Sequence, residues 1–237
     1  MKAVIVIPAR YGSTRFPGKP LVPIAGVSLI QRVYDRAKHS QRAEAVYVAT
    51  DDDRIFEHVR GFGGNVVKPE GDFQTGTDRI AAALPLIGTF DVIVNVQGDE
   101  PLIDIREVDA LIDRLANSDA DIGTLACPLE TDEEFANRDV VKVVVDDFGN
   151  AIYFSRAPIG SKNTAMRHIG VYAYRREAIT RFVSLPQSTL ERAESLEQLR
   201  GLQQRFKIAV LQTSKPHLGV DRPEDVFRVE NELAKQP

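Results

Sequence analysis

Residues 7–20 read IPARYGSTRFPGKP, and they follow an apolar run at residues 3–7 that is typical of a buried parallel strand. The stretch contains two glycines, three prolines, a serine, a threonine, two arginines and a lysine. Proline removes N–H donors and glycine relaxes the backbone, so we expect a loop rather than a helix or a strand. Exposed N–H groups and three cations in one loop suit a polyphosphate ligand.

This loop departs from the Walker A pattern. Five residues, not four, separate Gly12 from Gly18, and Lys19 is followed by Pro20 where a Ser or Thr would hold Mg²⁺. The sequence therefore predicts a nucleoside triphosphate held in a different geometry. The alternative is a solvated basic turn, which would seldom be this long and this rich in glycine and proline directly after a first strand.

Composition narrows the class of protein. The chain has 237 residues, 43% of them hydrophobic and 27% charged, so a core of normal size needs no disulfide or metal. The net charge of −4 argues against a nucleic-acid partner. The single cysteine, Cys127, precludes an intrachain disulfide and is expected to be buried.

No stretch approaches the roughly 20 apolar residues of a membrane span, and the apolar N-terminus is too short for a signal peptide. We therefore expect no membrane partner and a cytoplasmic location.

Strand and helix patterns alternate in the first half of the chain. Strands are expected at 3–7, 45–49, 65–67, 91–96 and 122–126, and helices at 29–37, 54–62, 77–86 and 105–116. This rhythm predicts an α/β fold with a mostly parallel sheet and helices on both faces.

The rhythm then breaks. Strands are expected at 140–145, 151–154, 169–174 and 208–211, and helices at 177–183, 190–204 and 223–234. We interpret residues 130–175 as a small antiparallel excursion that forms a lid or a dimer contact. One domain over 1–237 is expected.

Two acidic segments follow predicted strands. Ligands in parallel sheets bind outside the carboxyl ends of the strands, and Asp99 lies there, in QGDEP at 97–101. A carboxylate at this place suits Mg²⁺ on a polyphosphate. Asp221, in GVDRP at 219–223, is a second candidate, although N-capping of the last helix alone explains it well and is the favoured interpretation.

Other polar residues are open to two interpretations. Thr77 is expected to cap a helix whose N-terminus also presents N–H groups to a base or a phosphate. Arg156 and His168 would form an anion site if their strands are neighbours, but a lone histidine is usually structural. For Glu197 and Gln198 the helical pattern favours a solvated face.

Taken together, the motifs resemble the bacterial 3-deoxy-manno-octulosonate (Kdo) cytidylyltransferases. The matching stretches are IPARYGSTRFPGKPL (7–21), VATDD (48–52), GTDR (76–79), VNVQGDEP (94–101), YFSR (153–156), HIGVYAYR (168–175), ESLEQLR (194–200) and GVDRPED (219–225). They follow the order of the family and span nearly the whole chain. The first loop is shared with sialic acid cytidylyltransferases, whereas the later stretches are typical of the Kdo enzymes.

The resemblance implies a fold, a reaction and a set of partners. The fold is a Rossmann-like nucleotide-diphospho-sugar transferase sheet. The reaction joins CTP and Kdo to give CMP-Kdo and pyrophosphate, for lipopolysaccharide synthesis, with Mg²⁺ as cofactor and a homodimer as the assembly. The anomeric hydroxyl of Kdo attacks the α-phosphorus in line, which requires positioning and charge neutralisation.

Site residues are implied in the same way. The catalytic residues implied are Arg10, Arg15, Lys19, Asp99 and Asp221, and the last two are the Mg²⁺ ligands. The CTP contacts implied are Pro8, Ala9, Arg10, Ser13, Thr14, Lys19, Gly76, Thr77 and Arg79. The sugar-acid contacts implied are Gln97, Arg156, His168, Tyr172, Glu197 and Gln198, with Arg156 facing the carboxylate of Kdo.

One departure and three alternatives accompany the resemblance. Residues 160–165, GSKNTA, are shorter than the usual proline-rich loop of the family, which bears on the lid or dimer contact. The alternatives are a cytidylyltransferase for 8-amino-Kdo or sialic acid, a non-catalytic nucleotide sensor, and a molybdopterin or sugar-1-phosphate nucleotidyltransferase. Glu100 and ESLEQ at 194–198 favour Kdo, and intact Lys19, Asp99 and Asp221 argue against a sensor.

Overall fold

The computed structural model describes residues 1–12, 15–214 and 216–235, so Ser13 and Thr14 of the expected CTP contacts lie outside the described residues. The chain divides into two compact units, Met1–Asp109 with His217–Pro237, and Ala110–Pro216. The boundary falls inside one helix, α4 (Ile105–Ala116). The single domain expected over 1–237 stays a prediction.

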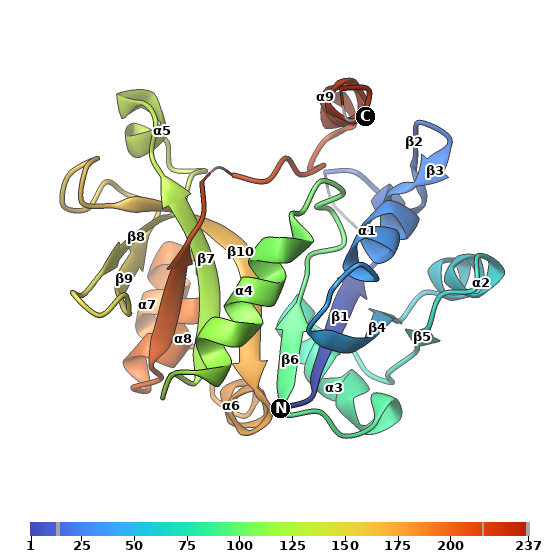
Figure 1. The fold of residues 1–237 in the computed structure, drawn as a ribbon, viewed down its shortest axis with the longest axis horizontal. Helices are drawn as coiled ribbons and strands as arrows, with labels where there is room; N and C mark the ends of the chain where they lie inside the picture. The colour runs from blue at the N-terminus through green and yellow to red at the C-terminus, as the bar shows by residue number, and fades with distance from the viewer. Residues whose placement is uncertain (13–14, 215, 236–237) are drawn as a thin grey trace. The chain divides into compact units, whose positions relative to one another are not determined.

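The first unit contains a parallel sheet (Figure 1). Its strands are β1 (Ala3–Ala9), β4 (Ala43–Thr50), β5 (Val66–Val67) and β6 (Val92–Asn95), in the order β6-β1-β4-β5. Ile5 pairs with Val46 on one side and with Val94 on the other. All residues of β1 are buried, as the continuous apolar run predicts for a strand covered on both faces.

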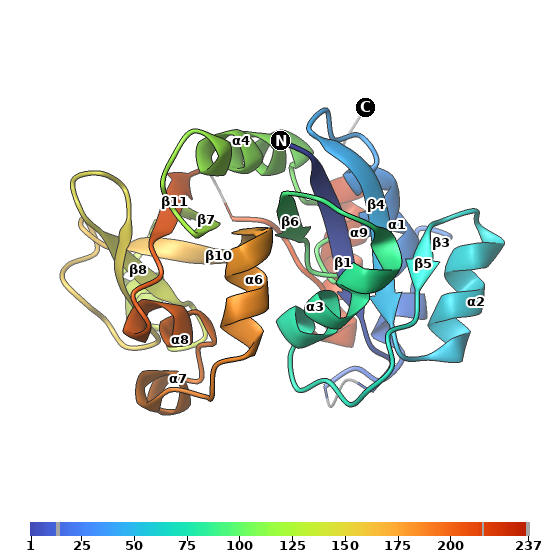
Figure 2. The ribbon, with the colours of Figure 1, turned by 90° about the horizontal axis from the view of Figure 1, so that it is seen from below.

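Helices of the first unit pack on this sheet (Figure 2). They are α1 (Leu29–Ala37), α2 (Asp53–Gly61) and α3 (Gly76–Ile87), whereas α9 (Pro223–Leu233) contacts the segment Pro23–Ile24 instead. In α1 the buried side chains include Leu29, Ile30, Val33 and Ala37, which recur at helical spacing and face β1 and β4. No helix in the described part of the chain is long and apolar enough to cross a lipid bilayer.

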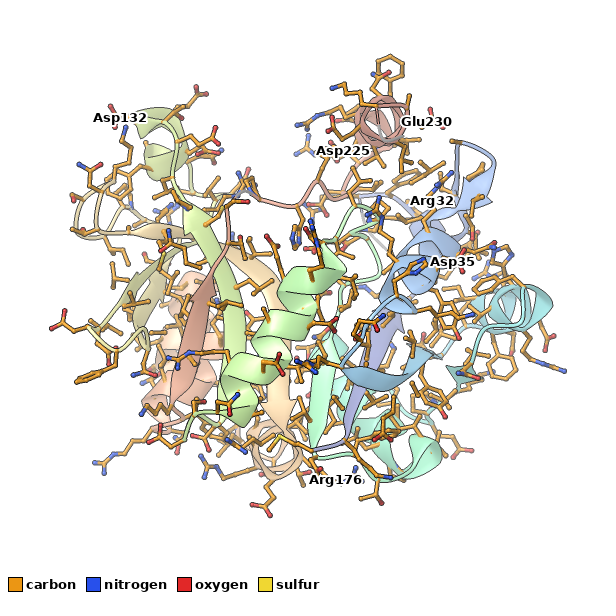
Figure 3. The ribbon with its side chains drawn as sticks, viewed as in Figure 1. Arg32, Asp35, Asp132, Arg176, Asp225 and Glu230 are labelled. Carbon is orange, nitrogen blue, oxygen red and sulfur yellow. The ribbon has the colours of Figure 1, made fainter. Side chains whose placement is uncertain are left out.

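A short hairpin that the sequence did not predict follows the glycine- and proline-rich loop. The loop ends in a 3₁₀ turn, η1 (Lys19–Leu21), and the hairpin consists of β2 (Pro23–Ile24) and β3 (Val27–Ser28). Two labelled side chains in Figure 3 hold it: Arg32 donates to the carbonyl oxygen of Ile24 at 2.6 Å, and Glu230 accepts from the amide of Ala25 at 2.7 Å. This hairpin therefore ties α9 to the end of the loop.

The second unit is mostly antiparallel. Its strands are β7 (Ile122–Pro128), β8 (Lys142–Val145), β9 (Ala151–Ser155), β10 (Met166–Arg175) and β11 (Ile208–Gln212), in the order β11-β7-β10-β8-β9. β11 pairs with β7 in parallel, whereas the β7–β10, β10–β8 and β8–β9 pairs are antiparallel. Its helices are α5 (Asp132–Ala136), α6 (Arg176–Val183), α7 (Thr189–Glu194) and α8 (Gln198–Gln203). The predicted α/β class, with a mostly parallel sheet and an antiparallel excursion, is confirmed.

The single helix expected over 190–204 is wrong. The chain forms α7 and α8, separated at Ser195, whose φ of 54° lies in the left-handed region. A buried ion pair joins the two helices: the guanidinium of Arg200 donates to both carboxylate oxygens of Glu191, at 2.9 and 2.6 Å. The break turns Gln198 into the interior, so the solvated face expected for it is also wrong.

Candidate functional site

A cavity of about 380 Å³ opens in the first unit, at the carboxyl ends of β1 and β6 and at the start of α3. This is the edge at which parallel sheets bind ligands. The predicted site residues that line it are Pro8, Ala9, Arg10, Arg15, Lys19, Gly76, Arg79, Gln97, Asp99 and Asp221. Thr77 is buried beside them in α3 but is not part of the lining. The structure therefore brings most of the predicted triphosphate, base and metal residues into one cavity.

Lys19 connects the two candidate metal ligands. Its Nζ lies 2.6 Å from Oδ2 of Asp99 and 3.7 Å from Oδ1 of Asp221. Nη2 of Arg15 lies 3.2 Å from the same oxygen of Asp221. The side chain of Lys19 is only 13% exposed, so its ion pair with Asp99 is partly shielded from water. Two carboxylates that share one cation are thus already arranged in the fold.

These two carboxylates fit Mg²⁺. Among the described residues no group of three or more His, Cys, Asp and Glu side chains is arranged to hold a metal ion. Mg²⁺ needs no such cage, because it usually takes one or two carboxylates together with substrate phosphates and water. Asp99 and Asp221 are therefore a suitable protein contribution when the remaining ligands come from a triphosphate.

Backbone and ring contacts shape the first loop. The amide of Gly18 donates to the carbonyl oxygen of Tyr11 at 2.9 Å and closes the loop on itself. Gly18 has a φ of 72°, and a Cβ there would lie 3.1 Å from the Tyr11 ring, so glycine is required twice over. The guanidinium of Arg54 stacks on the same ring at 3.2 Å from its centroid and pairs with Asp52. These contacts fix the two ends of the segment that carries Arg15.

Asp221 does not cap the last helix. The N-cap of α9 is Arg222, and the carboxylate of Asp225 accepts the amide N–H groups of both Asp221, at 3.0 Å, and Arg222, at 2.9 Å. Asp225 is labelled at the start of α9 in Figure 3. Because Asp225 satisfies the helix terminus, the carboxylate of Asp221 is left to pair with Arg15 and Lys19.

Thr75, rather than Thr77, caps α3. Its Oγ1 accepts from the amide of Asp78 at 3.1 Å, and its own amide donates to the Asp78 carboxylate at 3.2 Å, which forms a capping box. Thr77, the second residue of α3, is buried instead. A Cβ on Gly76 would lie 3.2 Å from the ring of Pro8, so only a small residue lets α3 approach β1 this closely.

Arg79 reaches the cavity from α3 with an unsatisfied donor. Its side chain is 4% exposed, and its Nη2 donates to the carboxylate of Asp51 at 2.8 Å. Its Nε is buried and has no hydrogen-bond partner among the described residues. A buried donor without an acceptor is costly, so this position favours a ligand that supplies an oxygen.

Asp51 does not line the cavity but pairs with Arg79, which does, and the sequence analysis assigned it no role. It is the first of three consecutive aspartates that follow β4. Only Asp52 caps α2, by accepting from the amides of Arg54 and Ile55. Because Asp51 directly precedes the cap and follows a parallel strand, its place at the ligand edge of the sheet was the available signal.

Five of the six expected sugar-acid residues belong to the second unit, and Gln97 belongs to the first. His168 on β10 packs against the rings of Phe154, at 5.0 Å, and Tyr172, at 5.5 Å. The hydroxyl of Thr124 donates to the carbonyl oxygen of Val171 at 2.8 Å, so Nε2 of His168 is the donor in their 3.0 Å contact.

Burial determines the charge of these groups. Burial lowers the pKa of His168 to about 3, so the imidazole is neutral at physiological pH and adds no positive charge to an anion site. Burial also raises the pKa of the Tyr172 hydroxyl, with smaller effects of Tyr174 and Glu197 in the same direction. The anion site considered for Arg156 and His168 therefore has one cation at most.

The guanidinium of Arg156 is engaged by the backbone. It donates from Nε to the carbonyl oxygen of Glu194 at 3.0 Å, and from its two Nη atoms to the carbonyl oxygens of Arg138 and Ser195. The amide of Arg156 donates to the Glu194 carboxylate at 2.9 Å. Glu197 lies beyond Ser195, 3.9 Å from Nη2 of Arg200. These contacts fix the position of Arg156 without neutralising its charge.

Comparisons with known proteins agree with this geometry. The profile of the cytidylyltransferase family matches residues 4–208. The 3-deoxy-manno-octulosonate cytidylyltransferase of Syntrophotalea carbinolica is 47% identical over 248 aligned positions, which cover 98% of this chain and 99% of the relative. The 8-amino-3,8-dideoxy-manno-octulosonate cytidylyltransferase of Shewanella sediminis is 44% identical and covers 99% of both chains.

A solved structure gives the same result for the fold. CMP:2-keto-3-deoxy-manno-octonic acid synthetase complexed with CTP superposes with a TM-score of 0.95, at 40% identity and 99% coverage of both chains. As the sequence motifs predicted from their resemblance to the Kdo cytidylyltransferases, the chain belongs to the cytidylyltransferase family.

Proposed function

We propose that this protein transfers CMP from CTP to Kdo and releases pyrophosphate. The observation that carries the proposal is the cavity of the first unit, which presents Arg10, Arg15 and Lys19 together with Asp99 and Asp221. Cations that neutralise a triphosphate and carboxylates that hold its metal ion are the groups that nucleotidyl transfer requires. The relatives named for Kdo and the CTP-bound neighbour support the same choice of substrates.

Each side chain of the cavity has a proposed role. Arg10, Arg15 and Lys19 bind the phosphates, and Arg15 and Lys19 stabilise the charge that builds up on the departing pyrophosphate. Asp99 and Asp221 hold Mg²⁺. When bound, Mg²⁺ neutralises phosphate charge and lowers the pKa of the attacking hydroxyl. Lys19, which pairs with both carboxylates in the structure, exchanges them for a phosphate oxygen.

At the other end of the cavity, Arg79 and the start of α3 bind cytosine. The buried Nε of Arg79 lacks an acceptor among the described residues, and the carbonyl oxygen of a pyrimidine is an acceptor of the right kind. Pro8, Ala9, Gly76 and Thr77 contribute the surrounding backbone and shape, and Ser13 and Thr14 complete the proposed CTP contacts.

The sugar-acid contacts are proposed for Gln97, Arg156, His168, Tyr172, Glu197 and Gln198. Arg156 supplies the positive charge for the carboxylate of Kdo, because neutral His168 acts as a hydrogen-bonding group. A homodimer, a cytoplasmic location and a role in lipopolysaccharide synthesis are further proposals that accompany this assignment. The antiparallel region near 130–175 stays proposed as a lid or a dimer contact.

The test includes 8-amino-Kdo as a second candidate substrate, because relatives named for 8-amino-3,8-dideoxy-manno-octulosonate are 42–44% identical to this chain. The experiment measures pyrophosphate release from CTP and Mg²⁺ with Kdo, 8-amino-Kdo or N-acetylneuraminate. We expect turnover with Kdo, and none in an Asp99→Asn variant whose circular dichroism is unchanged. Preference for another acid would move the sugar assignment, and no release with any of the three would overturn the proposed function.

A further inference from the structure

We propose that His217 is a positioning residue that latches segment 217–221 onto the turn that carries Asp99, and so sets Asp221 for metal binding. This inference rests on the proposed function, because it concerns the two carboxylates assigned to Mg²⁺. His217 is not part of the cavity lining and therefore acts through Asp221 rather than on the substrate.

The imidazole of His217 is held at both nitrogens. Its Nδ1 lies 3.3 Å from Oε2 of Glu100, and its Nε2 lies 2.6 Å from Oε2 of Glu107. The His217 side chain is 5% exposed, and the two glutamates are 15% and 19% exposed. Two carboxylate acceptors require two N–H donors, so the ring is the protonated imidazolium. Its single positive charge lies between two partly buried carboxylates, one of which, Glu100, directly follows Asp99 in the chain.

The pKa of His217 agrees with a protonated ring. Burial lowers the pKa of His217, but the hydrogen bonds and charges of Glu100 and Glu107 outweigh it, so the pKa lies above its ordinary value of 6.5. The pKa of Asp104 is lowered, mainly by its hydrogen bond with Arg106 and to a smaller extent by the charge of His217. Glu100 comes from the 97–101 turn, whereas Asp104 and Glu107 come from the start of α4.

The latch is continued by the backbone between His217 and Asp221. The amide of Val220 donates to the carbonyl oxygen of Asp99 at 2.8 Å. A Cβ on Gly219 would lie 3.3 Å from the same oxygen, so the two segments are in close contact at this point. Downstream, the carboxylate of Asp225 holds the amide of Asp221 at 3.0 Å.

Asp221 is therefore fixed from both directions along the chain, while its own side chain stays 57% exposed. Without the imidazolium, the segment would keep the Val220 hydrogen bond but lose its two contacts with Glu100 and Glu107, and these two carboxylates would repel each other. Supporting groups of this kind commonly change metal affinity by about 10- to 100-fold. We expect the effect of His217 at the lower end of that range.

Two measurements on the full-length chain test the latch. Hydrogen exchange of the Val220 amide, followed by NMR, reports on the position of the segment, and electron paramagnetic resonance of free Mn²⁺ reports on metal binding without turnover. The variants are His217→Ala, His217→Gln and Glu107→Gln, with His58→Ala as the control because His58 bonds Ser28 away from the cavity. In His217→Ala we expect faster Val220 exchange and Mn²⁺ binding weakened about tenfold, with neither change in His58→Ala.

The outcomes separate the latch from the proposed metal site. Unchanged Val220 exchange in a folded His217→Ala variant overturns the latch, and faster exchange with unchanged Mn²⁺ affinity overturns its role in metal binding. If His217→Ala does not fold, the same comparisons are made with His217→Gln and Glu107→Gln. Mn²⁺ binding that survives Asp99→Asn overturns the metal site itself, while Val220 exchange still decides whether His217 holds the segment.

Discussion

The neutral state of His168 predicts a specific loss of stability in acid. Its pKa is about 3 in the folded chain, because of burial, against about 6.5 when the chain is unfolded. As the pH falls below 6.5, His168 becomes protonated in the unfolded chain, whereas in the folded chain it stays neutral until about pH 3. The unfolded state is therefore favoured progressively over this window, and the loss is complete below it.

The size of the effect follows from the two pKa values. Between pH 7 and pH 5 the free energy of unfolding should fall by about 2 kcal/mol through His168 alone. The residue is only partly shielded in the fold, which makes this figure an upper bound. For a chain of this length, 2 kcal/mol corresponds to a decrease of about 4–8 °C in Tm.

The assay compares thermal unfolding of the wild type and of His168→Gln at pH 7 and pH 5. Glutamine keeps a donor for Thr124 but does not titrate, so its variant should lose less stability on acidification, by up to about 2 kcal/mol. Groups that titrate in both proteins, His217 among them, cancel in the difference. Equal acid losses in the two proteins would refute the reasoning, since they would show that His168 titrates normally in the fold.

Three other predictions follow from individual contacts. Lys19→Met should lower kcat/KM by about 10²- to 10³-fold, and a variant as active as the wild type would remove Lys19 from the mechanism. Its Tm should stay near that of the wild type, because Asp99 and Asp221 are 33% and 57% exposed and water can solvate their charges. Arg200→Met should reduce the free energy of unfolding by about 3–5 kcal/mol, since it leaves Glu191 charged and buried, and Glu191→Leu in the same chain should restore most of it in denaturation experiments. Ala25→Gly should raise the stability by up to about 1 kcal/mol, because Ala25 has a φ of 45°; an unchanged or lower Tm would argue against strain in the hairpin turn.

The sheet and the position of Asp99 at its ligand edge could be predicted because each depends on a strong local signal. β1 is a continuous apolar run, and Asp99 follows another, so parallel pairing alone brings both to one edge of the sheet. Lys19 belongs to the cationic loop that follows β1 and was expected among the phosphate ligands because of that loop. Its 2.6 Å ion pair with Asp99 lies at this edge of the sheet.

Other features had no local signal. The break at Ser195 interrupts a pattern in which Leu196 and Leu199 still fit a continuing helix, and serine in the left-handed region is not marked in the sequence. What favours the break is the ion pair of Glu191 with Arg200, nine positions further along the chain, which a straight helix would separate by about 13 Å along its axis. His217 was missed because its partners are more than a hundred positions away in the chain.

Asp221 shows how a structure decides between two interpretations that a sequence leaves open. In DRPED at 221–225 either Asp221 or Asp225 could cap the helix. A capping role would explain Asp221 without any ligand-binding site. The fold gives the capping role to Asp225, which accepts the amide groups of Asp221 and Arg222. The carboxylate of Asp221 is thus relieved of backbone partners and lies within 4 Å of both Lys19 and Arg15, so ion pairing with these cations is the role that the fold gives it. Because these two cations line the cavity as well, the same argument that removes the capping role favours the metal and triphosphate role.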